Sequence, residues 1–193
     1  MNTFRYVLAV LLIVTVPPAV FVWFVIHPFV RFWRRIGPGW TYAVLAVPWI
    51  ASMGLLFRAR RILLGADFGT RWTLVALGVA VFAGALALSV TRRRQLTMKI
   101  LSGIPELRKG DPGRLLTEGI YARLRHPRYV EVILGVISYA LVANYLGGYV
   151  VVLVTVASMV PLVLLEEREL RDRFGDAYDE YARRVPRFIP RWQ

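Results

Sequence analysis

Residues 130–165 read VEVILGVISYALVANYLGGYVVVLVTVASMVPLVLL. Two apolar runs, Val130–Tyr145 and Tyr149–Leu165, are separated only by Leu146, Gly147 and Gly148. A helix needs about 20 apolar residues to cross the hydrocarbon of a bilayer, so each run is near the lower limit. Because glycine adopts turn conformations without steric cost, the pattern predicts a tight antiparallel hairpin of two short membrane helices, with glycine in the turn.

Three longer apolar runs precede this hairpin: Phe4–Ile26, Trp40–Phe57 and Trp72–Val90. Hydrophobic residues make up 57% of the 193-residue chain, whereas soluble domains have about 45–50%. We therefore predict an all-α integral membrane protein with about five transmembrane helices. In the third run Ala76, Ala80 and Gly84 recur every four residues, which is expected to allow close packing of a neighbouring helix.

The chain carries a formal net charge of +13. Such a charge is common in nucleic-acid-binding proteins, but the apolar excess indicates basic loops of a membrane protein, and no nucleic-acid partner is predicted. With five spans, one side of the membrane holds five basic residues and the other holds twenty. Because basic residues accumulate on the inner side, the C-terminus is predicted to be cytoplasmic and the N-terminus outside, and the arginine-rich loops suit the plasma membrane of a prokaryote.

Ionisable residues are unevenly distributed along the chain. Residues 1–90 contain little besides the first three apolar runs, whereas residues 91–193 contain a polar connection, the hairpin and a polar tail. Any chemistry is therefore expected in residues 91–193, which we predict to be the catalytic half. With no cysteine and only two histidines, the chain is not expected to form a disulfide framework or a metal site.

The segment before the hairpin reads EGIYARLRHPRY, residues 118–129. Pro127 suits the first turn of a helix, which places His126 at the mouth of that helix, beside exposed backbone N–H groups. This position favours an anionic ligand group, such as a carboxylate or phosphate, and a neutral imidazole. The alternative interpretation is an interfacial anchor, in which Arg, His and Tyr side chains hold the helix at its depth in the membrane.

The tail begins with two carboxylates, Glu166 and Glu167, directly after an apolar run. Acidic residues at that depth are costly unless they are paired or line a cavity, so these two are candidates for holding a cationic ligand group. Apolar residues then recur at helical spacing, which predicts a cytoplasmic amphipathic segment; a helix lying on the membrane surface would show the same pattern. The hairpin brings this tail back beside His126, and the two segments together suit a zwitterionic small molecule.

Two motifs carry a resemblance to a known family. Gly119-Ile120-Tyr121 followed by Arg125-His126-Pro127-x-Tyr129 resembles the GxY…RHPxY signature of the isoprenylcysteine carboxyl methyltransferase (phospholipid methyltransferase) family of integral membrane enzymes. Residues 166–181 resemble that family's second signature, EExxLxxxFGxxYxxY. Order and spacing match from about Leu115 to Pro190.

The resemblance implies a membrane-embedded methyltransferase that uses S-adenosylmethionine. In this family the cofactor lies in a pocket built by the hairpin, the RHPxY segment and the C-terminal segment, and a lipophilic acceptor enters from the bilayer. Carried over residue by residue, the resemblance implies catalytic roles for Arg125 and Glu167. The cofactor-binding residues that it implies are Tyr121, His126, Pro127, Tyr129, Glu166, Glu167, Tyr178, Tyr181 and Pro190.

Two departures from the family pattern concern the acceptor. Glu131 stands where the family often has a small residue, and it is expected to snorkel, to pair with Arg125 or Arg128, or to contact the substrate. Met159–Leu165 carries no charge, whereas members that act on isoprenylcysteine have basic residues there. We therefore predict a different lipophilic acceptor, and a carboxylate, an amine, a hydroxyl and a thiol all remain open as its reacting group.

Two other functions are open from the sequence. Membrane sterol reductases are similar in their helical core and in an Arg-His motif, and they use a nicotinamide cofactor, whose phosphate the basic residues 92–94 would then hold. A non-catalytic membrane scaffold is the third possibility. The predicted partners are the lipid bilayer and a membrane-dissolved acceptor, and no oligomeric state is predicted.

Overall fold

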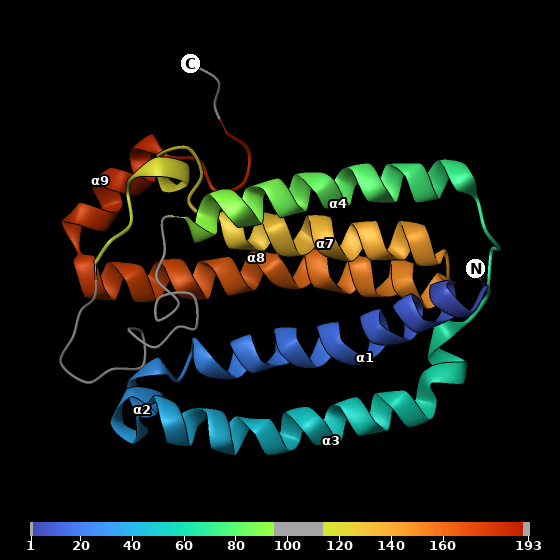
Figure 1. Cartoon of the computed structure of the whole chain (residues 1–193). Coiled ribbons are helices and arrows are strands. Elements are labelled where there is room, and N and C mark those ends of the chain that lie inside the picture. The colour runs from blue at the N-terminus through green and yellow to red at the C-terminus, as the bar shows by residue number, and fades with distance from the viewer. Residues whose placement is uncertain (1, 95–113, 191–193) are drawn as a thin grey trace.

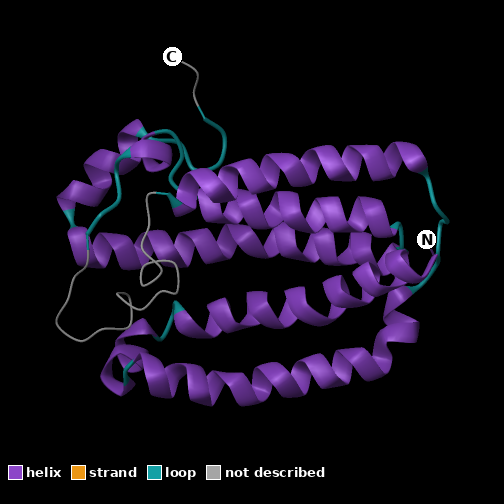
Figure 2. Cartoon of the chain, viewed as in Figure 1, coloured by secondary structure: helices purple, strands orange, loops and turns teal. Residues whose placement is uncertain are grey.

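The computed structural model describes residues 2–94 and 114–190, and helices dominate it (Figures 1 and 2). Four helices are long and apolar enough to cross a membrane: α1 (Asn2–Ile26), α3 (Pro38–Leu64), α4 (Trp72–Arg93) and α8 (Leu146–Phe174). The shorter elements are α2 (Val30–Ile36), the 3-10 helix η1 (Gly119–Ala122), α7 (Pro127–Ala143) and α9 (Asp176–Arg184). These described ranges contain no strand, so the predicted all-α class is confirmed.

The hairpin of α7 and α8 forms the centre of the bundle. α7 packs against α4 on one side and against α8 and α1 on the other, and α3 covers the outer side of α1 (Figure 1). With 17 residues, α7 is shorter than the four candidate spans. The count of about five transmembrane helices therefore stays a prediction.

The turn between α7 and α8 differs from the expected one. Asn144 and Tyr145 form it, and Asn144 adopts the left-handed conformation with φ at 55°, which Asn tolerates better than most residues. The side-chain nitrogen Nδ2 of Asn144 donates to the backbone carbonyl of Gly69 at 2.8 Å, so the turn is also bonded to the loop between α3 and α4. The prediction of a glycine turn was wrong, because a hydrogen-bonded Asn supplies the same conformation.

Gly147 and Gly148 instead belong to the first turn of α8, where they allow a close contact. A Cβ atom on Gly147 would lie 2.0 Å from the carbonyl oxygen of Leu63. The absence of a side chain at Gly147 therefore lets the start of α8 pack directly on the end of α3.

The small residues that α4 presents to α7 are also not the predicted ones. A Cβ atom on Gly78 would lie 2.7 Å from Cγ2 of Val142 on α7. Ala76, Ala80 and Gly84 are exposed on the other faces of α4. A four-residue spacing shows that residues share one face of a helix but not which neighbour that face contacts. In the structure, the face of α4 that contains Gly78 packs against α7.

The tail is divided by a break at Gly175. α8 continues past Leu165 to Phe174, so Glu166 and Glu167 lie on the spanning helix itself. Gly175, with φ at 54°, ends α8 and starts α9. α9 is amphipathic, and its aromatic residues are buried among apolar side chains of this chain: Leu115, Leu170, Phe174, Tyr178, Tyr181, Ala182 and Val185. Its apolar face is thus covered by protein rather than left for the membrane surface.

Candidate active site

The segment before α7 and the C-terminal segment after α9 are far apart in the sequence, but they lie side by side at the end of the bundle away from the N-terminus (Figure 1). The backbone N–H of Arg125 donates to the carbonyl of Pro186 at 2.9 Å, and that of His126 donates to the carbonyl of Arg187 at 3.2 Å. Pro127 is the first residue of α7, as predicted. These bonds fix the side chains of Arg125 and His126 beside the glutamates of α8.

Glu167 is fully buried and is surrounded by cations. Its Oε1 lies 2.8 Å from Nη1 of Arg125 and 3.1 Å from Nε2 of His126. Arg187 donates to both oxygens, from Nε to Oε1 at 3.0 Å and from Nη2 to Oε2 at 2.8 Å. A buried carboxylate is tolerated only when it is paired and hydrogen-bonded in this way. Glu167 therefore joins α8, the start of α7 and the C-terminal segment.

His126 lies between two carboxylates. Its Nδ1 is 3.4 Å from Oε2 of Glu166, and its Nε2 is 3.1 Å from Oε1 of Glu167. Burial disfavours the charged ring, but the two carboxylates outweigh it and hold the pKa of His126 above its ordinary value. The helix N-terminus was expected to favour a neutral imidazole, whereas the two glutamates in direct contact favour the charged ring.

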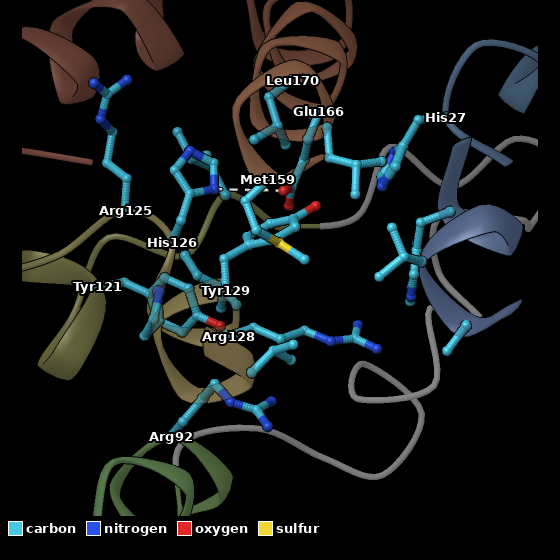
Figure 3. A pocket seen from close by; sticks show the side chains of 18 of the residues that line it. His27, Arg92, Tyr121, Arg125, His126, Arg128, Tyr129, Met159, Glu166 and Leu170 are labelled. Atoms are coloured by element: carbon cyan, nitrogen blue, oxygen red, sulfur yellow. Dashed lines mark ion pairs between the residues drawn. The ribbon is translucent and has the colours of Figure 1, made fainter. Parts of the chain in front are cut away.

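A cavity of about 720 Å³ opens beside this cluster (Figure 3). Its polar lining includes Tyr121, Arg125, His126, Arg128, Tyr129 and Glu166. Its apolar wall comes from α1, α7 and α8, with Val20, Val132 and Leu162 among the residues that form it. The volume lies within the roughly 300–1,000 Å³ range of small-molecule sites.

The structure brings six of the predicted site residues to this cavity: Tyr121, Arg125, His126, Pro127, Tyr129 and Glu166. Tyr181 stands behind the wall and supports it, because its hydroxyl donates to the carbonyl of Tyr121 at 2.7 Å. Glu167, Tyr178 and Pro190 are not part of the lining. Their assigned roles stay predictions, and Glu167 contacts the lining only through Arg125 and His126.

Glu131 has a different partner from those expected. Its Oε2 lies 2.9 Å from both Nε and Nη2 of Arg92, at the end of α4. Neither Arg125 nor Arg128 pairs with it. The rotation of α7 turns Glu131 toward α4, which the spacing within the motif does not reveal.

Three further residues of the site escaped the sequence analysis, and a fourth, Arg92, entered it only as a phosphate-binding residue of the reductase alternative. Trp23, His27 and Arg92 line the cavity from α1, the loop after it, and α4. Arg187 binds Glu167 from the tail. His27 is buried, stacks on Trp23 with ring centroids 5.4 Å apart, and has Nδ1 3.4 Å from Oε2 of Glu169. Neither of the two signatures contains these residues, which reach the site from separate elements, although Arg187 lies within the stretch that resembles the family up to Pro190.

The sequence profile of the phospholipid methyltransferases matches residues 73–177, more than half of the chain. The chain belongs to this family. The matched range runs from α4 into α9 and contains the first signature and the second as far as residue 177, and it is also the part of the chain that provides most of the cavity lining.

Three named proteins are similar to this chain over part of its length. The cobalt-zinc-cadmium resistance protein CzcN of Cupriavidus metallidurans is 38% identical over 78 residues, 40% of this chain and 36% of that protein. The protein-S-isoprenylcysteine O-methyltransferase of Schizosaccharomyces pombe is 35% identical over 77 residues, 39% of this chain and 33% of the enzyme. A Delta(14)-sterol reductase of Mus musculus is 28% identical over 120 residues, 61% of this chain and 29% of the reductase. The matches thus span about a third of each relative.

The charged side chains at the cavity suit a ligand that carries both a positive and a negative group. Glu166 presents a carboxylate whose buried Oε2 has Nδ1 of His126, at 3.4 Å, as its only ion-pair partner among the described residues. Arg125 presents a guanidinium whose Nε is likewise buried without a hydrogen-bond partner there. Buried polar atoms are rarely left unsatisfied. An ammonium or sulfonium beside Glu166 and a carboxylate beside Arg125 would satisfy both.

Proposed function

We propose that this membrane protein is an S-adenosylmethionine-dependent methyltransferase that acts on a lipophilic acceptor. The observation that carries the proposal is the cavity in the family segment, which joins a zwitterion-binding polar end to an apolar wall. The cofactor supplies a methyl group that is already activated on a positively charged sulfur. The protein therefore has mainly to position the two reactants and to exclude water.

Several polar residues of the cavity have a role in holding the cofactor. Glu166, whose carboxylate lines the cavity beside His126, attracts the cationic end. Arg125 binds the carboxylate of the cofactor. The aromatic rings of Tyr121 and Tyr129 are part of the same cavity lining. Glu167 is a positioning residue, because it orients Arg125 and His126 without touching the cavity.

The apolar wall fits an acceptor that arrives from the bilayer. Val20, Val132 and Leu162 extend the cavity along helices that are themselves apolar, so an alkyl or prenyl chain is not exposed to water there. The isoprenylcysteine relative supports methyl transfer to such a compound. The acceptor is proposed to differ from isoprenylcysteine, since the wall segment Met159–Leu165 has no basic residue. In this proposal the site faces the cytoplasm of a prokaryotic cell, where the cofactor is made.

The alternative is a reductase that uses a nicotinamide cofactor, and the mouse sterol reductase is the observation in its favour. Arg92 does line the cavity, as a phosphate-binding residue would. The carboxylate of Glu166 argues for the methyltransferase, because it would repel the phosphates of a dinucleotide while attracting a sulfonium.

Ligand-induced stabilisation of the purified full-length chain in neutral detergent tests the proposal. S-adenosylhomocysteine, the demethylated cofactor, should raise the melting temperature, with about 2.7 kcal/mol of stabilisation at 100 times its dissociation constant. Stabilisation by NADPH alone would favour the reductase, and none by either ligand would favour a scaffold. Incorporation of label from methyl-labelled S-adenosylmethionine into a lipid extract then identifies the acceptor.

A further inference from the structure

The charged side chains at the cavity lie in two groups. In Figure 3 Glu166 lies between His126 and His27, whereas Arg128 and Arg92 lie together on the other side. The first side is accounted for by the proposed cofactor site. The two arginines are not, and neither belongs to the residues that the family resemblance implies for the cofactor.

Arg128 reaches across the cavity from the first turn of α7 to α1. Its guanidinium carbon lies 4.4 Å from the ring centroid of Trp23, close enough for a cation–π contact. Among the residues that the structure describes, no carboxylate lies within ion-pair distance of Arg128. The stacking orients the guanidinium, and no carboxylate of the described residues pairs with it.

Arg92 approaches the same side from the end of α4 and is only 6% exposed. Its Nε and Nη2 both lie 2.9 Å from one oxygen, Oε2 of Glu131. A guanidinium has five N–H donors, and the contacts with Glu131 involve only the Nε and Nη2 atoms. Glu131 therefore holds Arg92 in place without saturating it.

The arginines stand beside the apolar wall of the cavity. Val132 lies one turn after Arg128 on α7, and Val20 lies one turn before Trp23 on α1, and both line the cavity. A lipophilic chain along this wall would therefore place its polar end at the two guanidinium groups. Planar guanidinium donors bind carboxylates and phosphates in parallel pairs of hydrogen bonds.

We propose that Arg92 and Arg128 form an oxyanion subsite that binds a carboxylate or phosphate group of the lipophilic acceptor. The inference rests on the proposed function and adds to it the chemical class of the acceptor, an anionic amphiphile. These arginines come from α4 and α7 rather than from Met159–Leu165, so the anionic group of the acceptor would lie at a different place from the one that the family pattern implies for isoprenylcysteine. The cofactor carboxylate is bound separately, by Arg125 on the side of Glu166 and His126.

The experiment measures binding of simple anionic amphiphiles to the full chain in neutral detergent, by shifts in melting temperature over a titration. Dodecyl phosphate and dodecanoate should bind, whereas dodecyltrimethylammonium should not. Arg92→Gln and Arg128→Gln should each weaken binding of the anionic probes about tenfold or more, because a charge-assisted hydrogen bond is lost. Glu131→Gln should strengthen it, because a competing carboxylate is removed. Arg93→Gln and Arg123→Gln, which change exposed neighbours, should leave it at the parent value.

Other outcomes would overturn the inference. Equal competition by inorganic phosphate would show a site for soluble anions rather than for an amphiphile. Weakened binding of S-adenosylhomocysteine in the two arginine variants, with unchanged binding of the amphiphiles, would place the cofactor at this side. Failure of S-adenosylhomocysteine to stabilise the parent chain counts against the proposed function instead. The oxyanion subsite is then judged on the amphiphile titration alone.

Discussion

Arg187 holds Glu167 with two parallel hydrogen bonds, from Nε to Oε1 at 3.0 Å and from Nη2 to Oε2 at 2.8 Å. This bidentate pair ties the C-terminal segment to α8, and it occupies oxygens that would otherwise be open to a ligand. Glu166, one residue earlier, has no such partner and lines the cavity. Two adjacent glutamates of one motif thus have different surroundings, since Glu167 is buried among cations and Glu166 lines the cavity.

We predict that Glu166→Gln mainly lowers ligand affinity, whereas Glu167→Gln mainly lowers stability. Glu166→Gln should lower the affinity for S-adenosylhomocysteine by about 1.5–3 kcal/mol, the value of a charged hydrogen bond, with little change in the melting temperature of the ligand-free protein. Glu167→Gln should lower the unfolding free energy by about 3 kcal/mol, because Arg125, His126 and Arg187 lose a buried partner.

Melting temperature and ligand titration on the same samples separate the two effects. If Glu167→Gln melts like the parent but loses cofactor affinity, Glu167 contacts the cofactor directly, as the family resemblance implies. Arg184→Gln serves as a control, since its pair with Glu180 is exposed on α9 and should contribute little.

The buried His126 predicts how stability depends on pH. Its folded pKa lies above the ordinary value of 6.5 because Glu166 and Glu167 favour the charged ring, while Arg125 and Arg187, held on the same Glu167, face it from the other side. The charged ring of His126 therefore stabilises the fold fully below about pH 6.5, and this stabilisation is lost as the pH rises through the pKa of the folded state. The melting temperature of the ligand-free protein should therefore fall over that upper range.

His126→Gln should remove this part of the pH dependence, because glutamine does not titrate there. The chain has only two histidines, so NMR of histidine-labelled protein can follow the ring of His126 directly. Equal slopes of melting temperature against pH in the parent and the variant would show that the ring is not charged in the fold.

The opposite end of the bundle contains a second buried cluster, around Arg5. Its side chain is 1% exposed, and it binds Asp67 and the carbonyl of Ala143, the latter at 3.0 Å. Arg5→Met should lower the unfolding free energy by about 2 kcal/mol, since buried acceptors lose their donor. Affinity for S-adenosylhomocysteine should not change, because the cavity lies at the other end.

The matched control is Arg58→Met, an exposed arginine on α3. It should melt within a degree or two of the parent in the same thermal scan. A loss of ligand affinity in Arg5→Met after refolding to the parent helix content would mean that the two ends of the bundle are coupled.

Much of the fold follows from local patterns in the sequence. The apolar runs locate the helices, and Pro127 marks the start of α7, because each depends on a short stretch of chain. The hairpin also predicts that His126 and Glu166 meet, since the two motifs flank it. The turn at Asn144 and the extension of α8 to Phe174 do not follow, because they depend on tertiary hydrogen bonds and packing.

The partners within the site are harder to predict than its motifs. Arg187 reaches Glu167 only because Gly175 breaks the helix and turns the tail back. Arg92 meets Glu131 only because α4 and α7 pack with one particular rotation. Such pairings are set by the three-dimensional arrangement of whole helices, and residue spacing within one segment carries no information about them.

Gly147 gives the sharpest test of the helix packing. A methyl group there would meet the carbonyl oxygen of Leu63 at 2.0 Å, and that oxygen is backbone at the end of α3 and has little freedom to move. Gly147→Ala should therefore lower the melting temperature clearly, as overpacking typically costs about 1–3 kcal/mol. Gly135→Ala on α7 is the matched substitution, because no atom lies within 4 Å of its added Cβ. It should raise stability slightly, by about 0.4–1 kcal/mol, because alanine has fewer conformations to lose on folding. Equal melting temperatures for the two variants would show that α8 does not lie against the end of α3.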